Sequence, residues 1–337
     1  MSITAKELAK LLNLSEAAIS MALNNKPGVS TQTRKKVIAL AKEHGYDFSK
    51  LSTPQVSPGN NGSIFFILYC KHGAVVTDTP FFAQLSNGIS HACEQGNYYV
   101  NIQYLYDNSD IDTKLEEYAR IGCKGIVLLG TEMQQEDLKP FLASPIPLVI
   151  LDCYFDEIAA NYVLINNIQG AYIATNHLIQ KRKKQPGYLH SSYSIQNFNE
   201  RADGFFKAIR ANGMSTSRSV IHKLTPSMEG AYSDMLSIIE SGEDLAACYF
   251  ADNDLIAAGA IKAFKEKGYD VPKDISVIGF DDMPLCTYID PPLSTIQVPK
   301  QYMGEAAAKR LMELIATPNS FPVKIEVETC LIRRKSV

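Results

Sequence analysis

Three short helical patterns follow one another within the first 45 residues, and they leave few folds open to this part of the chain. Thr4 can cap a first helix, with Glu7 three residues later as a capping box requires. Ser15 can cap a second helix and Ser30 a third. Two helices of this length cannot enclose a core, so the pattern predicts three helices packed together. Their inward residues recur at helical spacing and are Leu8, Ala9 and Leu12, then Ile19, Ala22 and Leu23, then Val37, Ile38 and Ala41.

This predicted unit has the form of a helix-turn-helix whose second helix begins with small polar residues and fits the major groove of DNA. Residues 1–50 carry eight basic and four acidic side chains, whereas residues 51–337 carry 25 basic and 32 acidic ones. A basic head on an acidic body suits phosphate contact at one end only. Charge alone fits a small helical domain with a solvated basic face equally well. The helix pattern favours DNA binding.

The same segment resembles the headpiece of the LacI/GalR family of bacterial transcriptional regulators. The motifs that carry the resemblance are Leu14-Ser15, Ile19-Ser20, Leu23-Asn24-Asn25 and the run Lys26-Pro27-Gly28-Val29-Ser30-Thr31-Gln32-Thr33-Arg34. The resemblance implies that Glu16, Ala17 and Met21 face base edges, and that Ser15, Ser20 and Asn24 hold the DNA backbone. The full set of expected DNA contacts is Thr4, Ser15, Glu16, Ala17, Ser20, Met21, Asn24, Asn25, Ser30, Thr33 and Arg34.

Met21 departs from the family pattern, because many members have an arginine there. Arginine is the side chain best shaped to donate two hydrogen bonds to guanine, whereas methionine offers only apolar contact, for example to a thymine methyl group. Glu16 can accept from a cytosine amino group or can repel phosphate. We therefore expect an operator that differs from the usual family sequence at the positions that Met21 faces.

A linker at residues 49–62 is the second departure. The family resemblance implies a short hinge helix whose leucine wedges into the minor groove and kinks the DNA. Here the linker holds two prolines, two glycines and two asparagines, which oppose a regular helix. Leu51 is its only leucine. The sequence predicts a flexible tether, with a hinge turn at residues 48–53 at most, and it does not favour operator bending.

Beyond the linker, apolar runs alternate with helical patterns, which is typical of parallel strands joined by crossover helices. Two successive sets of this kind predict an α/β body with two doubly wound subdomains that face each other across a cleft. About 275 residues are enough to bury two such cores. The expected strands are 64–69, 99–105, 125–129, 148–151, 162–165, 187–190, 219–224, 246–250 and 275–279, and the expected helices are 82–94, 112–120, 136–142, 169–180, 198–211, 231–240 and 255–267.

The family resemblance continues through this body in three motifs, which are residues 249–264, 271–282 and 290–296. It implies a periplasmic-binding-protein-like effector domain at residues 63–337 behind a headpiece at residues 1–48. The first subdomain would comprise about 63–164 and 297–327, and the second about 165–293 and 328–337. Asp252 stands where the family usually has a small residue.

An effector site follows from the same resemblance and from chemistry. Ligands bind where strands end and helices begin in open α/β sheets. Aromatic rings can stack on a sugar, carboxylates accept from its hydroxyls, and a guanidinium supplies a fixed fork of donors. The expected effector contacts are Phe81, Phe82, Asp152, Arg201, Asn253 and Asp281.

Each of these contacts has a structural alternative. The two phenylalanines can belong to the core, since an aromatic residue at a helix start often packs inward. Arg201 can pair with Asp203 or with a neighbouring strand end. We also expect either Asp281 or Asp282 to cap backbone amides instead of holding a ligand.

Other chemistry is not indicated. The seven cysteines include no Cys-x-x-Cys pair, and no signal peptide or membrane span is visible, so reduced thiols in a cytoplasm are expected, not disulfides. The histidines do not cluster at ligand spacing, and no nucleophile–base motif is present. Lys181 to Lys184 form a basic run, expected in a solvated turn, where the family usually carries Gly-His. We expect no metal, no cofactor and no catalysis.

Two functional hypotheses remain. The first is a homodimeric repressor that binds double-stranded operator DNA and whose affinity changes when a small carbohydrate enters the cleft. Purines and other small metabolites stay open as effectors. In the second, the DNA-binding head is the same, but the body responds to a protein co-regulator, as some regulators of this family do. A transport-type binding protein is a weaker third reading, because the headpiece and the missing secretion signal oppose it.

Overall fold

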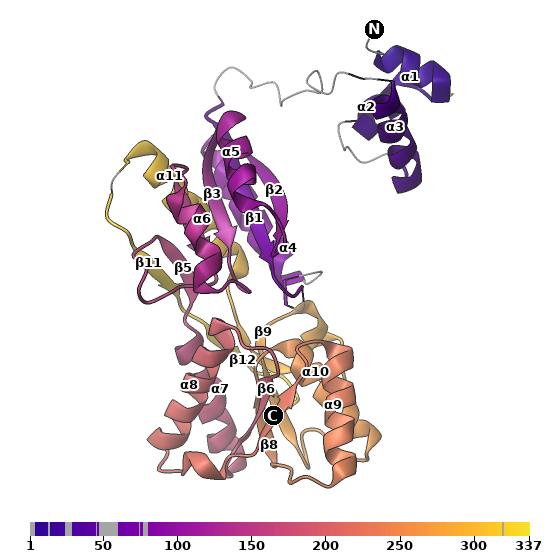
Figure 1. The fold of residues 1–337 in the computed structure, drawn as a ribbon. Coiled ribbons are helices and arrows are strands. Elements are labelled where there is room, and N and C mark those ends of the chain that lie inside the picture. Colours follow the sequence, from indigo (N-terminus) through magenta and orange to yellow (C-terminus); the bar gives the residue numbers. More distant parts are fainter. Residues whose placement is uncertain are drawn as a thin grey trace. The chain divides into compact units, whose positions relative to one another are not determined.

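A computed structural model describes most of the chain, which divides into two compact units at residues 1–60 and 61–337 (Figure 1). Each unit is described by itself. The residues that the structure describes are 4–12, 14–23, 29–44, 46, 60–73, 75–76, 80–318 and 320–337. The linker prediction falls almost entirely on residues 49–59, which lie outside these ranges.

The first unit contains three helices, α1 (Ala5–Leu12), α2 (Glu16–Leu23) and α3 (Thr31–Glu43). The predicted caps are confirmed. The Thr4 amide donates to the Glu7 carboxylate at 2.8 Å, and the Glu7 amide donates back to the Thr4 hydroxyl at 3.3 Å. The hydroxyl of Ser15 accepts from the amide of Ala18, and that of Ser30 from the amide of Thr33, both at 3.1 Å. Side-chain oxygens thereby satisfy amides that a helix start would leave unpaired.

The core of this unit follows the predicted periodicity with one exception. Ile38 is only half-buried, and Leu40 packs against the core in its place. Leu12 contributes from the edge. The buried residues are Leu8, Ala9, Ile19, Ala22, Leu23, Val37 and Ala41.

The second unit contains two six-stranded sheets. The strands of the first lie in the order β11-β5-β4-β3-β1-β2, and every pair is parallel. The sheet consists of β1 (Gly62–Cys70), β2 (Tyr98–Tyr106), β3 (Cys123–Leu129), β4 (Leu148–Leu151), β5 (Tyr162–Ile165) and β11 (Lys324–Val327). Its helices are α4 (Pro80–Gln95), α5 (Ile111–Arg120), α6 (Lys139–Ala143), which follows a 3-10 turn at Gln135–Leu138, and α11 (Lys300–Ala316).

Strand β1 shows why this sheet is buried on both faces. Its side chains alternate between two apolar clusters, with Ile64, Phe66 and Leu68 in one and Phe65 and Ile67 in the other. A central parallel strand therefore reads as a continuous apolar run, as the sequence predicts.

The strands of the second sheet lie in the order β12-β10-β9-β8-β6-β7, and only β12 runs antiparallel to its neighbour. They are β6 (Gly187–Ser191), β7 (Ile221–Leu224), β8 (Cys248–Ala251), β9 (Ser276–Asp281), β10 (Ser294–Gln297) and β12 (Cys330–Ile332). The helices of this half are α7 (Asn167–Arg182), α8 (Gln196–Ala211), α9 (Met228–Ser241) and α10 (Asp254–Glu266). The predicted α/β architecture is confirmed.

The chain crosses between the two sheets three times: between β5 and α7, between β10 and α11, and between β11 and β12. The last four elements, from β10 onward, have no counterpart among the expected strands and helices. Helix α11 packs against α4 at close range, and two glycines permit this contact. A side chain at Gly88 would collide with the Gln301 carbonyl, and one at Gly304 would collide with the Leu85 carbonyl. This contact brings the first turns of both helices to the edge of the sheet where the strands end.

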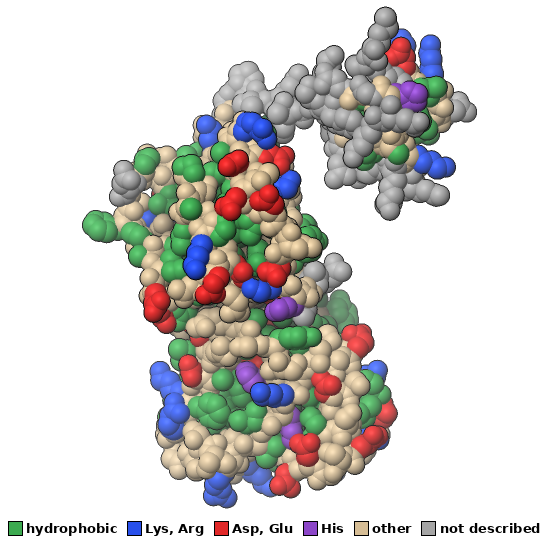
Figure 2. Space-filling view, in the orientation of Figure 1, with side chains coloured by type: hydrophobic (Ala, Val, Ile, Leu, Met, Phe, Trp, Pro, Cys, Tyr) green, Lys and Arg blue, Asp and Glu red, His purple; other side chains and the backbone are tan. Residues whose placement is uncertain are grey.

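Surface and composition add four observations. On the face of residues 61–337 seen in Figure 2, acidic and basic side chains are interspersed. Within the described ranges, every helix is too short or too polar to span a bilayer, and no group of His, Cys, Asp and Glu is arranged to hold a metal ion. All seven cysteines are free thiols.

Candidate effector cleft and DNA-contact residues

A cleft lies between the two sheets, and all six expected effector residues line it. The first sheet's half supplies Phe81, Phe82 and Asp152, and the second sheet's half supplies Arg201, Asn253 and Asp281. The cleft encloses about 40 Å³, which is room for only a few water molecules. The other lining residues are Val75, Thr131, Ile195, Asn197, Phe198, Pro226, Leu255 and Met283.

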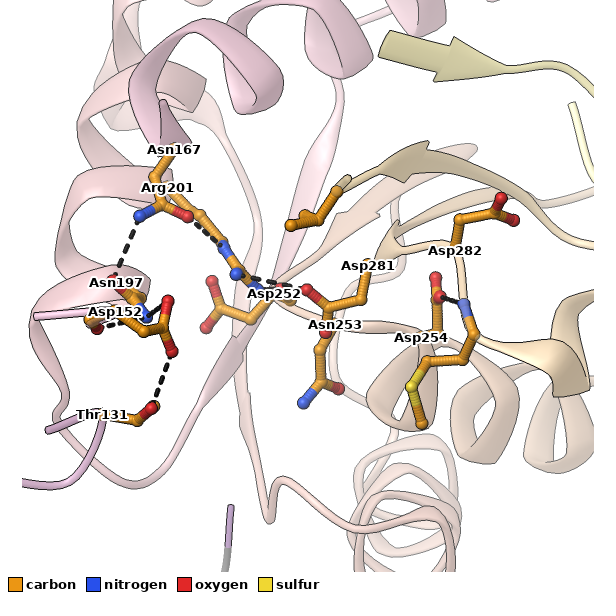
Figure 3. A network of polar contacts seen from close by, with 12 residues as sticks. Thr131, Asp152, Asn167, Asn197, Arg201, Asp252, Asn253, Asp254, Asp281 and Asp282 are labelled. Atoms are coloured by element: carbon orange, nitrogen blue, oxygen red, sulfur yellow. Dashed lines mark hydrogen bonds and ion pairs between the residues drawn. The ribbon is translucent and has the colours of Figure 1, made fainter. Parts of the chain in front are cut away.

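Arg201 is the central polar group of the cleft. It projects from α8 and is only 3% exposed. Its Nε donates to Oδ1 of Asn167 at 2.9 Å, and its Nη2 donates to Oδ1 of Asp281 at 3.3 Å (Figure 3). Its Nη1 donates to the backbone carbonyl of Asp252. The ring of Phe280 lies 3.8 Å from the guanidinium carbon. Of the two structural alternatives for Arg201, the pair with Asp203 is wrong and the pair with a neighbouring strand end is confirmed, because the guanidinium reaches Asp281 at the end of β9.

Asp152 follows β4 and bridges the two halves of the cleft. The Thr131 hydroxyl donates to its Oδ2 at 2.7 Å, and the Asn197 amide group donates to its Oδ1 at 3.0 Å. Burial raises the pKa of Asp152 to about 6, although Thr131 and Arg201 act in the opposite direction. The carboxylate can therefore accept hydrogen bonds from a ligand at neutral pH.

Asp281 ends β9 and faces Arg201. Burial raises its pKa, while the charges of Arg201 and Lys300 lower it. Lys300, at the start of α11, donates to the backbone carbonyl of Asp281 and holds this strand end from the other side. The first turn of α11 thus supports the site.

Left-handed backbone is concentrated at the cleft. Of the five non-glycine residues with positive φ in the described part of the chain, Asp152, Asp281 and Asp282 lie at strand ends beside the cleft, with φ of 66°, 110° and 53°. Such backbone costs about 1–3 kcal/mol per residue and gathers at functional sites. The aspartates are therefore held in place by the surrounding fold.

Asn253 is the N-cap of α10, and its Oδ1 accepts from the amide of Ile256 at 2.9 Å. This role leaves its Nδ2 as the donor that the side chain can present to the cleft. Phe81 and Phe82 are each 7% exposed and meet edge to face, with ring centroids 5.2 Å apart. They belong both to the apolar core and to the cleft wall, so the core reading is confirmed and their contact with a ligand stays a prediction.

The expected backbone cap at Asp281 or Asp282 is wrong. The amide of Met283 donates instead to Oδ2 of the fully buried Asp254 at 2.8 Å. Asp282 accepts from the side chains of Arg334 at 2.7 Å and Gln297 at 2.9 Å. Asp254 is thus the residue that accepts from this backbone amide. Asp282 connects the end of β9 to the final segment of the chain through Arg334.

The headpiece places part of the expected DNA-contact set on α2. Glu16 and Ser20 are exposed there, and Met21 is half-buried. Thr4, Ser15, Ser30 and Thr33 lie at helix starts, and the hydroxyls of Ser30 and Thr33 bond to each other at 2.8 Å. Asn24 and Asn25 lie outside the described residues, as do the side chains of Ala17 and Arg34.

Two family models match this chain. The model of bacterial regulatory proteins of the lacI family matches residues 4–48, and that of the periplasmic binding protein-like domain matches residues 175–337. The chain belongs to the LacI/GalR family. This LacI/GalR protein is a DNA-binding transcriptional regulator and not an enzyme, as the sequence predicts.

Its relatives match over nearly the whole length. The HTH-type transcriptional repressor PurR of Mannheimia succiniciproducens is 29% identical, with 99% of this chain and 98% of the relative covered. The HTH-type transcriptional regulator GalS of Salmonella typhimurium is also 29% identical, with 99% and 96% covered. A solved LacI family regulator from Enterococcus faecalis with bound ribose has a TM-score of 0.67 and 26% identity, over 81% of this chain and 98% of that structure.

Several cleft residues of this LacI/GalR regulator escaped the sequence analysis. Thr131 lies two residues after the end of β3, close to where Asp152 follows β4, so the strand-end rule could have found it. Asn197 lies one turn before Arg201 on α8 and carries no motif of its own. Glu132 is buried behind the cleft and accepts backbone hydrogen bonds from residues 71, 72, 73, 75 and 76 at 2.8–3.1 Å. It holds the loop that brings Val75 to the cleft.

Proposed function

We propose that this LacI/GalR regulator is a homodimeric repressor whose operator affinity changes when a small carbohydrate binds in the cleft. The observation that carries the proposal is the convergence of Asp152, Asp281 and Arg201 with two phenylalanine rings in a single cleft. Two carboxylates accept from hydroxyl groups, a guanidinium donates to ring or hydroxyl oxygens, and aromatic rings cover an apolar sugar face. The solved relative with bound ribose supports this class of ligand.

The cleft gives such a ligand a way to act on the whole body. Its lining comes from both subdomains, and the hydrogen bond between Asn197 and Asp152 already joins them. A ligand that binds both walls favours the arrangement of subdomains in which those contacts form. Operator affinity changes if the two arrangements differ in their affinity for DNA.

Dimerisation is part of the proposal, since one short headpiece contacts too few base pairs to be specific. The edge strand β2 offers a face for a second copy. Ile102, Tyr104 and Tyr106 alternate along it and are all exposed. With Phe82 and Ala83 of α4, Ile102 and Tyr104 also line a groove of about 210 Å³.

A protein co-regulator is the second candidate, and the volume of the cleft favours it. About 40 Å³ is too little for a sugar ring, and Arg201 and Asp281 bond to each other. A free sugar must therefore open the cleft and exchange those bonds for its own. A body that takes its signal from a protein surface needs no such opening.

A thermal-shift screen of the purified full-length protein tests the first proposal. The panel holds monosaccharides and oligosaccharides, sugar phosphates, and purine bases and nucleosides. A sugar that binds the folded state raises the melting temperature in proportion to the logarithm of its concentration. Stabilisation by purines alone would replace carbohydrate as the effector class. Silence across the whole panel would favour the co-regulator.

A further inference from the structure

Asp252 is a fully buried carboxylate next to the effector cleft. It follows β8 and directly precedes the cleft residue Asn253, although it does not itself line the cleft. A buried carboxylate is tolerated only where several donors compensate for its lost hydration. The donors that surround Asp252 therefore show what it holds in place.

Three groups along strand β6 donate hydrogen bonds to this carboxylate. The hydroxyl of Tyr188 donates to Oδ1, while Nδ1 of His190 at 2.8 Å and the backbone amide of Ser191 at 2.6 Å contact Oδ2. Tyr188 is itself fixed, because its ring packs nearly parallel to the rings of Phe205 and Phe250 at centroid distances of 4.9 and 5.3 Å. The carboxylate thus pins the carboxyl end of β6 to the carboxyl end of β8.

The backbone of Asp252 makes two further connections. Its amide donates to the carbonyl of Leu189 at 3.1 Å, and its carbonyl accepts from Nη1 of Arg201. Strand β6, strand β8 and helix α8 therefore meet at one residue. The segment that leaves β6 at Ser191 carries three cleft residues, Ile195, Asn197 and Phe198.

We propose that Asp252 is a positioning residue of the effector cleft, which fixes the segment 191–198 through its carboxylate and Arg201 through its carbonyl. The proposal rests on the proposed function of the cleft. It assigns to one residue the placement of Ile195, Asn197 and Phe198 against the opposite wall.

Two substitutions separate hydrogen bonding from charge. Asp252→Ala removes the acceptor and leaves the Tyr188 hydroxyl and the Ser191 amide without it, while the carbonyl that binds Arg201 remains. Asp252→Asn also removes the charge, but it can keep the hydrogen bonds to Tyr188, His190 and Ser191. Its amide oxygen can accept from Ser191 and His190, and its amide nitrogen can donate to the Tyr188 oxygen. A positioning role therefore predicts that the asparagine variant rescues what the alanine variant loses.

Hydrogen exchange on the full-length protein without ligand gives the first test. In Asp252→Ala, amides of residues 191–198 should exchange at least tenfold faster than in the wild type, with strands β1 and β3 unchanged as an internal reference. Asp252→Asn should stay close to the wild type. Unchanged exchange in the alanine variant, equal effects of both variants, or acceleration spread evenly over residues 61–337 would each overturn the proposal.

Ligand binding gives the second test, with whichever panel compound stabilises the wild type. Asp252→Ala should raise the dissociation constant of that compound at least about tenfold, and Asp252→Asn should raise it less than about threefold. Wild-type binding by the alanine variant overturns the positioning role. If no compound stabilises the wild type, the proposed effector function fails, whereas the exchange experiment still decides the role of Asp252.

Should Asp252→Ala fail to fold, Tyr188→Phe takes its place in both measurements. This variant removes one of the three donors and keeps the stacked ring. It should accelerate hydrogen exchange in residues 191–198 and weaken binding of the compound, both by a smaller factor than in the alanine variant. If Tyr188→Phe changes neither the hydrogen exchange nor the binding of the compound, the positioning role of the contacts around Asp252 is contradicted.

Discussion

Asn197 donates a hydrogen bond to the Asp152 carboxylate over 3.0 Å, and these two residues belong to opposite walls of the cleft. The other oxygen of the carboxylate accepts from Thr131, on the same wall as Asp152. Each carboxylate oxygen can accept a second hydrogen bond, so a ligand hydroxyl that donates to Asp152 would bind the carboxylate that already joins the two walls. Such a ligand would favour the arrangement of the subdomains in which these contacts form together.

The charge of Asp152 should make stability depend on pH. Burial raises its pKa to about 6, whereas an unfolded chain has an aspartate pKa of about 3.9. Between these values the folded state binds more protons than the unfolded state, so stability declines as pH rises from about 4 to about 6. The difference corresponds to about 3 kcal/mol.

Asp152→Asn does not titrate and should lose this decline. Its free energy of unfolding relative to the wild type should be larger at pH 8 than at pH 4, by up to about 3 kcal/mol. Urea denaturation of both proteins at pH 4, 6 and 8 measures the difference. Asp254, whose pKa burial raises to about 7, contributes equally to both proteins and cancels. A difference that stays constant with pH would contradict the prediction.

Arg201→Ala should abolish the effector response and leave operator binding intact. The variant removes the donors to Asn167 and Asp281 and leaves the half-buried Asp281 carboxylate without this partner, which costs up to about 3 kcal/mol of stability. Binding should therefore be measured well below the melting temperature. Arg201→Lys keeps the charge without the planar fork and should bind effector weakly.

Arg182→Ala is the matched control for the loss of an arginine. Arg182 donates to the backbone carbonyls of Pro272 and Lys273 at 2.9 Å and does not line the cleft. Effector titrations followed by fluorescence anisotropy on labelled operator compare the variants. Equal loss of operator and effector binding in Arg201→Ala, or loss of response in Arg182→Ala, would count against the assigned site.

Local features of the sequence predicted much of this structure. The caps at Thr4, Ser15 and Ser30 depend on residues only three positions away. A buried strand such as β1 can be predicted from its uninterrupted apolar run. The six expected effector residues meet in one cleft because five of them lie at a strand end or a helix start, where the topology of parallel sheets gathers side chains, and Arg201 reaches it from the second turn of α8.

Long-range partners could not be predicted in this way. The pairing of Arg201 with Asp281 instead of Asp203 depends on how β9 lies beside α8, and no local pattern encodes that neighbourhood. The last four elements are short or return to a sheet formed much earlier in the chain. Lys300 reaches the cleft only because the chain crosses back between β10 and α11. The backbone amide of Met283 donates to Asp254 and not to Asp281 or Asp282, where it was expected. This pairing also could not be predicted, because Asp254 and Met283 lie 29 residues apart in the sequence.

A charge on the β2 face should weaken the proposed dimer. Tyr104 is 54% exposed on the same side of the edge strand as Ile102 and Tyr106. Tyrosine at the centre of an interface is often worth about 2 kcal/mol or more, and a buried aspartate adds a desolvation cost. Tyr104→Asp should raise the dimer dissociation constant at least about tenfold, the equivalent of about 1.4 kcal/mol.

Sedimentation velocity across a concentration series measures this constant. Tyr288→Asp serves as the control, because Tyr288 is 86% exposed and lies in the 3-10 region after β9, away from β2. A dimer that survives Tyr104→Asp unchanged would remove β2 as the interface. Equal weakening by both variants would show that added negative charge acts without regard to position.

Met21 should set the base preference of the headpiece at the positions it faces. It lies on α2, one turn after Ala17 and next to the exposed Ser20. Methionine can contact a thymine methyl group but cannot bond to guanine, whereas arginine donates twice to the O6 and N7 atoms of guanine. Met21→Arg should therefore select guanine at one position in each half-site, with a preference of about 1–3 kcal/mol.

Binding-site selection from a random duplex library measures this preference for the wild type and the variant. Met21→Leu keeps an apolar side chain and should select the wild-type sequence. If Met21→Arg selects that same sequence, another residue reads the base, and α2 then lies in the groove in a different register.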